Sequence, residues 1–450
     1  MVLGKKNFLI LGFTNRTGFH VAKFLVKKEC NVFITDKVRD NEKEKLLEEV
    51  KEVGKGNVID LLGTEDVPLN EIDIIISSPG VPLENPIIQS ALKKGIEVIG
   101  DIELFYNLNP NIRYFAITGT DGKTTTTNLT YQILKSHLPN TFMAGNVGIP
   151  IFSLEGEIEN LVVEISSFQI DTTKLFRPFV GAITNIAKDH LDRYHSFEDY
   201  TNSKFSLFKN SKEEDFAILN ISLLPYLTSR NIKPQKIFFS AFSGKLETQH
   251  NQVYLKDNFI FLNDEKIINT KKVKLIGKHN IENIMIAVAT GKIMNIPNEK
   301  MEEVVYNFTP LPHRMEFVRE LNGIKFINDS KATTINAMIS AIKSIDNPII
   351  LIVGGLDKGM DFSEAIPIIK EKVKYLIAIG STKNLIIEKL VQSRYKKCQK
   401  VETLEEAVKS AKELGKSGDI VLFSPGYASF DMFKNYEDRG NKFKEIVNSL

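Results

Sequence analysis

The stretch Thr118-Gly-Thr-Asp-Gly-Lys-Thr124 is the part of this 450-residue sequence that decides its fold. It follows an apolar run, Arg113 to Thr118, that predicts a buried strand, and it precedes a helical pattern from Thr124 to about Lys135. Glycines in such a turn let backbone N–H groups close around phosphate, a lysine reaches the terminal phosphates, and a hydroxyl suits Mg²⁺. The strand-loop-helix context therefore favours a nucleotide-binding loop over the alternative, a glycine turn capped by threonine.

Patterns of parallel sheets lie on both sides of this loop. Residues 7–12 read as a buried strand, a helical pattern covers 19–28, and a second strand covers 31–35, which together make a βαβ unit. The last 140 residues or so again alternate strands with helices. We predict an α/β fold of three domains: a Rossmann-like N-terminal domain (1–107), a central P-loop ATPase-like domain with a flanking β-meander (108–310), and a Rossmann-like C-terminal domain (311–450).

Composition limits the classes of partner. Lys and Arg number 58 against 56 Asp and Glu, so no overall basic field favours nucleic acid or an acidic membrane surface. The two cysteines, Cys30 and Cys398, form neither a disulfide framework nor a metal-ligand cluster, which fits a reducing compartment. The apolar runs are strand-sized and far below the roughly 20 residues of a membrane span. We expect a cytoplasmic monomer that acts on small molecules, without nucleic acid or membrane partners.

The loop departs from the common phosphate loop because two residues, not four, separate Gly119 from Gly122. In this shortened form it resembles the ATP loop of the Mur ligases and of the related folylpolyglutamate synthases. Further motifs that resemble the Mur ligases follow in order along the chain: Gly145–Gly148, Glu164–Gln169, Thr184–Asp192, Lys204, Gly277–Asn283, Leu311–Glu316 and Asn328–Thr333. Two C-terminal motifs, Gly354–Phe362 and Ser424–Gly440, are similar to those of the D-glutamate-adding members. The Asp-Asn-Pro-Arg segment that resembles the diamino-acid-adding members is absent from the sequence.

The resemblance implies an ATP-dependent ligase that joins D-glutamate to UDP-N-acetylmuramoyl-L-alanine during synthesis of the peptidoglycan precursor. A carboxylate is a poor electrophile, so amide formation requires its conversion to an acyl phosphate, and two anions must then be brought together. Lysine side chains and Mg²⁺ neutralise their repulsion. The implied cofactors are ATP, Mg²⁺ at two sites, and a CO₂-derived carbamate on Lys204.

The same resemblance assigns residues to the ATP site and its chemistry. The expected ATP-binding residues are Gly119, Thr120, Asp121, Gly122, Lys123, Thr124, Thr125, Asn280, Asn283, Arg314 and Asp329. The expected metal ligands are Thr124, Glu164, His190 and Lys204 as its carbamate. The expected catalytic residues are Lys123, His190, Lys204 and Lys331.

The two remaining substrates are assigned to opposite ends of the chain. The UDP substrate is expected at Thr14, Asp36, Ser78, Asn146 and His190. For D-glutamate the resemblance implies Thr333, Lys358, Ser429 and Tyr436. Lysines and hydroxyl donors suit the two carboxylates of this amino acid. The first strand-to-helix turn, Gly12 to Gly18, is not Gly-x-Gly-x-x-Gly, which disfavours a nicotinamide cofactor.

Each assignment has a plainer alternative. Glu164 could be a carboxylate on the surface at the end of a strand, His190 a helix cap, and Lys204 and Lys358 solvated lysines. The whole chain could instead be a folylpolyglutamate synthase, or a P-loop switch or motor that hydrolyses a nucleotide without an acyl acceptor. The C-terminal motifs count against the first of these.

Overall fold

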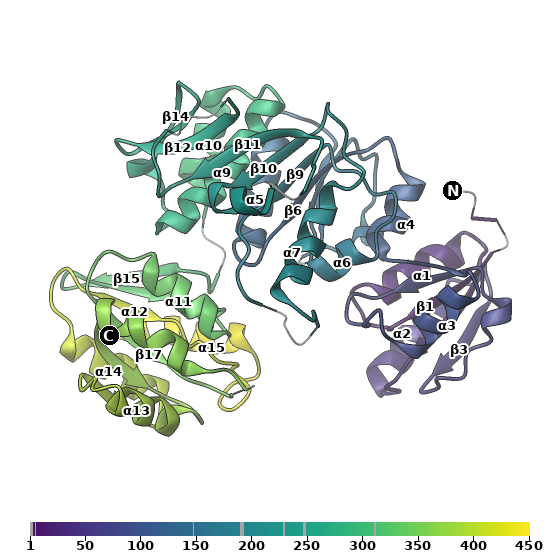
Figure 1. Cartoon of the computed structure of the whole chain (residues 1–450). Helices are drawn as coiled ribbons and strands as arrows, with labels where there is room; N and C mark the ends of the chain where they lie inside the picture. Colours follow the sequence, from purple (N-terminus) through teal and green to yellow (C-terminus); the bar gives the residue numbers. More distant parts are fainter. Residues whose placement is uncertain are drawn as a thin grey trace. The chain divides into compact units, whose positions relative to one another are not determined.

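The computed structural model describes residues 3–4, 6–146, 148–189, 193–227, 230–245, 249–309, 312–357 and 359–450. The chain is α/β and is built around three sheets, as the sequence predicts (Figure 1). The first two sheets belong to one compact unit, Met1–Asn269 with Glu282–Val305, and the third belongs to a second unit, Thr270–Ile281 with Tyr306–Leu450. Among the helices in the described part of the chain, none is both long enough and apolar enough to cross a membrane.

The first sheet is doubly wound and parallel. Its order is β3-β2-β1-β4-β5, with β1 (Asn7–Leu11), β2 (Asn31–Asp36), β3 (Val58–Leu62), β4 (Ile74–Ser77) and β5 (Glu97–Ile99). Its helices are α1 (Gly18–Lys27), α2 (Asn41–Lys51) and α3 (Pro86–Lys93). Phe8 and Ile10 join the apolar cluster on the α1 side, while Leu9 and Leu11 join the one on the α3 side. Burial of both faces explains why β1 is continuously apolar.

The second sheet carries the phosphate loop. Its order is β14-β13-β12-β11-β10-β9-β6-β8-β7. The strands are β6 (Arg113–Thr118), β7 (Thr141–Gly145), β8 (Asn160–Glu164), β9 (Val180–Ile183), β10 (Phe216–Asn220), β11 (Gln235–Ser240), β12 (Asn251–Lys256), β13 (Phe259–Leu262) and β14 (Glu265–Asn269). The predicted meander is confirmed for β12 to β14, which pair antiparallel, whereas β11 pairs parallel with β12.

Helices connect these strands. They are α4 (Asp101–Leu108), α5 (Lys123–Lys135), α6 (Ser167–Asp171), α7 (Phe197–Phe205), α8 (Leu224–Leu227), α9 (Lys278–Ile293) and α10 (Asn298–Asn307). Helix α4 ends at Leu108, one residue beyond the end that the sequence predicts for the N-terminal domain. The carboxylate of Glu103 on α4 accepts hydrogen bonds from the backbone N–H groups of Leu175 (2.7 Å) and Phe176 (3.0 Å), so α4 is fastened to the second sheet's domain.

The third sheet has the order β15-β16-β20-β17-β18-β19. Its strands are β15 (Glu316–Leu321), β16 (Ile324–Asn328), β17 (Ile349–Val353), β18 (Val373–Ala378), β19 (Cys398–Lys400) and β20 (Ile420–Phe423). The expectation of a purely parallel sheet is wrong at one edge, because β15 pairs antiparallel with β16 through the turn at Asn322-Gly323. Both residues of this turn have positive φ, which suits a hairpin.

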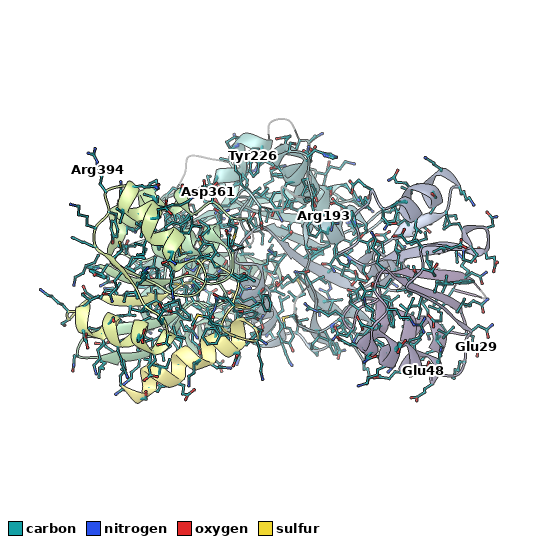
Figure 2. The ribbon with its side chains drawn as sticks, turned by 90° about the horizontal axis from the view of Figure 1, so that it is seen from below. Glu29, Glu48, Arg193, Tyr226, Asp361 and Arg394 are labelled. Carbon is teal, nitrogen blue, oxygen red and sulfur yellow. The ribbon has the colours of Figure 1, made fainter. Side chains whose placement is uncertain are left out.

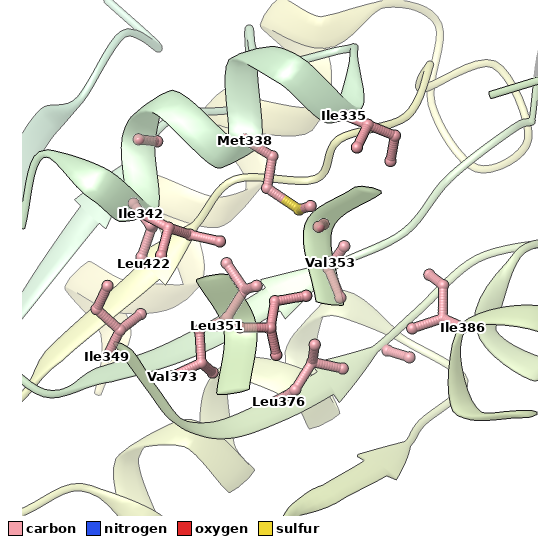
Figure 3. Close-up of a cluster of buried hydrophobic side chains, with 14 of the residues drawn as sticks. Ile335, Met338, Ile342, Ile349, Leu351, Val353, Val373, Leu376, Ile386 and Leu422 are labelled. Atoms are coloured by element: carbon pink, nitrogen blue, oxygen red, sulfur yellow. The ribbon is translucent and has the colours of Figure 1, made fainter. Parts of the chain in front are cut away.

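Helices and an apolar core complete the third domain. The helices are α11 (Ile335–Lys343), α12 (Ile366–Lys372), α13 (Lys383–Gln392), α14 (Leu404–Leu414) and α15 (Tyr436–Ser449). Helix α12 is preceded by a 3₁₀ turn, Phe362–Ala365, and Pro367 suits the first turn of the α-helix. Figure 3 shows one face of the core, where Leu351 and Val353 of β17 meet Met338 and Ile342 of α11.

Candidate functional site

The phosphate loop between β6 and α5 needs its two glycines. Gly119 has φ +142° and Gly122 has φ +82°, conformations that side chains rarely adopt. A Cβ on Gly119 would lie 1.9 Å from Thr184 Oγ1, and one on Gly122 would lie 2.4 Å from Asn283 Oδ1. The loop therefore runs against two polar side chains with no room for a larger residue.

Residues that follow β9 hold this loop in place. Thr184 Oγ1 donates to the carbonyl of Asp121 (2.6 Å), and the backbone N–H of Asp121 donates to Asn185 Oδ1 (3.0 Å). The backbone N–H of Thr120 donates to the carbonyl of Asn185 (3.0 Å). These bonds fix the loop before any ligand arrives, which is the preorganisation that a charge-stabilising site requires.

Lys123, the first residue of α5, lies on the loop that it follows. Its Nζ donates to the carbonyls of Gly119 (2.9 Å) and Thr120 (2.7 Å). Thr124 and Thr125, next on the helix, are buried. Lys123 and Thr124 therefore lie together where the loop meets α5, and their binding of phosphate and Mg²⁺ stays a prediction.

Glu164, at the end of β8, is only 1% exposed. Its Oε1 accepts a hydrogen bond from Asn146 Nδ2 (3.2 Å), while among the described residues its Oε2 is buried without a hydrogen-bond partner. The alternative of a surface carboxylate is therefore wrong. A buried carboxylate oxygen that lacks a donor fits a hard cation such as Mg²⁺.

Lys204, on α7, is also buried beside the loop. Its side chain is 1% exposed, its Nζ donates to the carbonyl of Gly119 (3.0 Å), and it lies 4.5 Å from the ring centroid of Tyr200. Burial, and then the charge of Lys123, lower the pKa of Lys204 to about 7. The alternative of a solvated surface lysine is wrong.

A cavity of about 670 Å³ lies at the carboxyl end of the first sheet and reaches the second sheet's domain. It is lined by four of the residues that we assigned to the UDP substrate, namely Thr14, Asp36, Ser78 and Asn146. Sequence reasoning missed Arg16, Asp101 and Gln169, which also line it. Gln169 Nε2 donates to the buried carboxyl of Asp101 (3.3 Å). Gln169 lies in a motif that we quoted, so it could have been found, whereas Asp101 carries no such signal.

Asp36 is held by the N-terminal domain itself. Its carboxylate accepts hydrogen bonds from the backbone N–H of Phe13 (2.8 Å), that of Val38 (3.0 Å) and Lys43 Nζ (2.8 Å). Burial opposes ionisation of Asp36, but these bonds, that of Lys43 foremost, lower its pKa. Asp36 thus fixes the wall of the cavity by binding the turn after β1.

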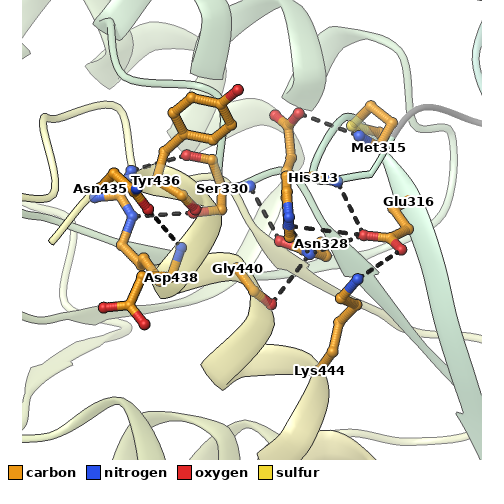
Figure 4. Close-up of polar contacts among 12 residues, drawn as sticks. His313, Met315, Glu316, Asn328, Ser330, Asn435, Tyr436, Asp438, Gly440 and Lys444 are labelled. Atoms are coloured by element: carbon orange, nitrogen blue, oxygen red, sulfur yellow. Dashed lines mark hydrogen bonds and ion pairs between the residues drawn. The ribbon is translucent and has the colours of Figure 1, made fainter. Parts of the chain in front are cut away.

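In the C-terminal domain, Lys331 and Tyr436 come together. Lys331 Nζ lies 3.1 Å from the Tyr436 hydroxyl and 4.8 Å from its ring centroid. The buried Asp329 carboxylate accepts hydrogen bonds from the backbone N–H of Met315 (3.2 Å) and from Ser424 Oγ (2.8 Å). Ser330, which lies between Asp329 and Lys331, donates to the Tyr436 carbonyl (2.9 Å; Figure 4), so the segment after β16 is bound to the start of α15.

Two buried residues that sequence reasoning missed support this region. His313 is 4% exposed, and its Nδ1 lies 3.0 Å from Asn328 Nδ2 (Figure 4). Arg439 is 1% exposed and donates to Ser330 Oγ (3.0 Å), the Ser330 carbonyl (2.8 Å) and the Tyr427 carbonyl (3.1 Å). Burial lowers the pKa of Arg439 to about 10. Both residues lie inside the quoted motifs, but sequence alone gives no sign of their burial.

The other predicted residues are placed as follows. Asn283 accepts a hydrogen bond from Thr126 Oγ1 (3.0 Å) beside the phosphate loop, and Asn280 donates to the carbonyl of Ile276 (2.7 Å). Ser429 is 2% exposed. Thr333 and Arg314 are half-buried, and the backbone N–H of Thr333 donates to the carbonyl of Lys331 (2.8 Å). His190 and Lys358 lie outside the described residues.

Known families match three successive parts of the chain. The descriptions are "Mur ligase MurD-like, N-terminal domain" for residues 6–100, "Mur ligase middle domain" for residues 117–291, and "Mur ligase, glutamate ligase domain" for residues 313–426.

Among similar proteins, the UDP-N-acetylmuramoylalanine–D-glutamate ligase of Aquifex aeolicus is 44% identical over 84% of this chain and 88% of its own. The ligase of the same name from Clostridioides difficile is 38% identical over the whole of both chains. The solved MurF of Acinetobacter baumannii is 15% identical with a TM-score of 0.59, covering 97% of this chain and 93% of its own. The UDP-N-acetylmuramate–alanine ligase MurC of Thermotoga maritima is 19% identical with a TM-score of 0.57, covering 98% and 99%. These two structures show the fold.

Proposed function

Because this chain belongs to the Mur ligase family, we propose that it joins D-glutamate to UDP-N-acetylmuramoyl-L-alanine at the expense of ATP. The observation that carries this is a phosphate loop flanked by the buried Lys204 and by a Glu164 carboxylate oxygen that has no hydrogen-bond donor in the described part of the chain, beside a cavity large enough for a nucleotide substrate. The names of the full-length relatives supply the substrates.

The first step is activation of the UDP substrate's carboxylate. A carboxylate oxygen attacks the γ-phosphorus of ATP, the bond to the bridging oxygen breaks, and ADP leaves with the electron pair. The backbone N–H groups of the loop and Lys123 would hold the phosphates, and Thr124 with Glu164 would hold Mg²⁺, which offsets the repulsion between the two anions. Among the described residues no three His, Cys, Asp or Glu side chains converge as a metal cluster, so ATP oxygens and water would complete this site.

Lys204 is proposed to act as a carbamate. An ammonium at this position would repel a cation, and its desolvation by burial favours the neutral amine. The neutral amine adds to CO₂ and releases a proton, and the product offers oxygens of the kind that Mg²⁺ prefers. With His190, the modified side chain would hold a second Mg²⁺.

The second step forms the amide. The D-glutamate amine attacks the acyl phosphate, inorganic phosphate leaves, and the amine loses a proton. We propose that Thr333, Lys358, Ser429 and Tyr436 bind the amino acid, and that Lys331 lies near the reacting carboxylates. Asn280, Asn283, Arg314 and Asp329 would complete the ATP site.

The UDP substrate would occupy the cavity of about 670 Å³, with Thr14, Asp36, Ser78 and Asn146 on its wall and His190 at its reacting end. We further propose that the enzyme acts as a cytoplasmic monomer in peptidoglycan precursor synthesis. Cys30 is buried, and neither cysteine is in a disulfide, which suits a reducing compartment.

Phosphate release tests the proposal. Release from ATP should require both UDP-N-acetylmuramoyl-L-alanine and D-glutamate, and a screen of other amino acids should favour D-glutamate. Release that ignores both substrates would indicate a nucleotide-hydrolysing switch or motor. Release that requires a folate substrate would indicate a folylpolyglutamate synthase.

A further inference from the structure

Arg193 comes from the second sheet's domain and contacts the first. Its Nη1 donates to the carbonyl of Gly80 (3.1 Å), and its Nη2 donates to those of Val81 (3.3 Å) and Pro79 (3.4 Å). Arg193 is labelled in Figure 2. Three successive carbonyls of the turn after β4 therefore share one guanidinium group.

That turn is one edge of the cavity. Ser78 and residues 79–81 line the cavity. On another side the turn packs against Gly12, since a Cβ there would lie 2.8 Å from Val81 Cγ2, and Ser78 Oγ donates to the Gly12 carbonyl (2.5 Å). The turn is thus held by the end of β1 and by Arg193.

The guanidinium is itself fixed by stacked rings. It lies 4.2 Å from the ring centroid of Phe168 at the start of α6. The ring of Phe168 stacks on that of Tyr194, with 5.8 Å between the ring centroids and an interplanar angle of 15°. The ring centroids of Tyr194 and Tyr200 are 5.3 Å apart. The Tyr200 hydroxyl lies 3.1 Å from Thr120 Oγ1 of the phosphate loop. One continuous set of contacts therefore connects the edge of the cavity with the loop.

We propose that Arg193 is a positioning residue for the UDP substrate. It holds the turn at residues 79–81 in the conformation that the bound nucleotide requires, and the stack on Phe168 keeps the guanidinium aimed at the three carbonyls. This proposal rests on the proposed function. It adds a residue that no motif pointed to, acting through the turn rather than by contact with the reacting atoms.

The chemistry of the side chain explains why arginine stands here. A guanidinium is planar, carries five donors in a fixed fork, and stacks on an aromatic face. A lysine ammonium is a point charge on a flexible stem, so it cannot bind three carbonyls and stack together. Arg193→Lys should therefore keep only part of the function.

Binding measurements by calorimetry test the proposal with the full-length enzyme. Arg193→Ala should weaken binding of UDP-N-acetylmuramoyl-L-alanine about tenfold, the effect of losing one hydrogen bond to a charged donor, while the affinity for ATP stays unchanged. Arg193→Lys and Phe168→Leu should give smaller losses. In turnover, the KM for the UDP substrate should rise while kcat at saturation is retained.

Arg230→Ala is the matched control. Arg230 also lies over a phenylalanine ring, 5.1 Å from the centroid of Phe205. It donates to the Tyr226 carbonyl (2.6 Å) and to Asn202 Oδ1 (3.0 Å), both in the second sheet's domain. Its loss should leave UDP-substrate affinity unchanged.

Three outcomes would overturn the proposal. Undiminished affinity in Arg193→Ala would show that the turn needs no arginine. An equal loss of UDP-substrate and ATP affinity with a lowered Tm would show a merely structural role. If Arg193→Ala fails to fold, the absence of a selective loss of UDP-substrate affinity in both Arg193→Lys and Phe168→Leu would overturn the proposal. A wild-type enzyme that does not bind the UDP substrate would instead refute the proposed function.

Discussion

Replacement of Lys204 by alanine tests whether this buried lysine acts as the proposed carbamate or is an ordinary ammonium. As an ammonium it would oppose a cation at the phosphate loop, and as a carbamate it would bind one. We expect Lys204→Ala to lose activity by at least about 10²–10³-fold, the scale of removing one preorganised charge-stabilising group. Short carboxylic acids should restore part of the activity, because they supply the missing oxygens.

Burial of Lys204 sets the fraction of its amine that is neutral, and therefore able to react with CO₂, at pH 7. At pH 7 a lysine with a pKa of 10.5 is neutral in about one molecule in 3,000, whereas a pKa of about 7 makes about half neutral. Burial thus raises the reactive fraction by on the order of a thousandfold. Since protons compete with CO₂ for the amine, activity at limiting CO₂ should fall as the pH drops below about 7.

The lowered pKa of Lys204 also makes the free energy of unfolding depend on pH. Between pH 10.5 and about 7 the unfolded chain binds a proton at Lys204 that the folded chain does not. Without CO₂, stability from this group is therefore present above pH 10.5 and is lost as the pH falls to about 7. Lys204→Ala should remove that slope from denaturation curves measured across this range.

The assay is phosphate release with and without added formate or acetate. The control is Lys209, an exposed lysine four residues beyond the end of α7. Lys209→Ala should retain activity, and added acid should not raise that activity. Wild-type activity in Lys204→Ala, without any acid, would refute the carbamate. So would a denaturation slope identical to that of the wild type, since it would remove the basis for a neutral amine.

Three further predictions concern the phosphates, the acceptor and the intermediate. Lys123→Ala should retain the fold, as judged by circular dichroism, and lose turnover by at least about 10²–10³-fold; near-normal rates would remove Lys123 from the ATP site. Lys358→Ala should raise the KM for D-glutamate much more than that for the UDP substrate, and equal effects in steady-state kinetics would place this lysine elsewhere. With ATP and the UDP substrate but no amino acid, borohydride should reduce the activated carboxyl to an alcohol detectable by mass spectrometry, and failure under conditions that trap other acyl phosphates would argue against this order of steps.

The sequence predicted the parts of the fold in which apolar residues follow a regular spacing or in which a turn has a distinctive sequence. The phosphate loop was predictable because Gly119 and Gly122 must adopt positive φ between a strand and a helix. The antiparallel strand β15 was missed although Asn322-Gly323 is a strong hairpin signal, because the weakly alternating burial of β15 gives no clear strand pattern. Local pattern therefore located the turn between β6 and α5 but not the edge of the third sheet.

The environment of single side chains was less predictable. Lys204 reads as an ordinary helical lysine, and only the packed structure shows that it is buried beside Gly119. Arg193 lies next to a quoted motif, yet its partners are carbonyls more than 100 residues earlier in the chain. Motif spacing cannot reveal contacts that the fold creates between distant segments.

The cavity of about 670 Å³ lies close to Glu164 because of the register between β7 and β8. β7 and β8 pair in parallel with Gly145 opposite Glu164, so the next residue, Asn146, emerges beside that carboxylate. Asn146 lines the cavity and donates to Glu164 Oε1, leaving Oε2 without a donor among the described residues. A slip of β7 by one residue would turn its side chains to the opposite face of the sheet and take Asn146 away from Glu164. Gly145 enforces the pairing, because a Cβ there would lie 2.2 Å from the carbonyl of Glu164. The glycine before Asn146 therefore helps to place the wall of the cavity beside the Glu164 carboxylate.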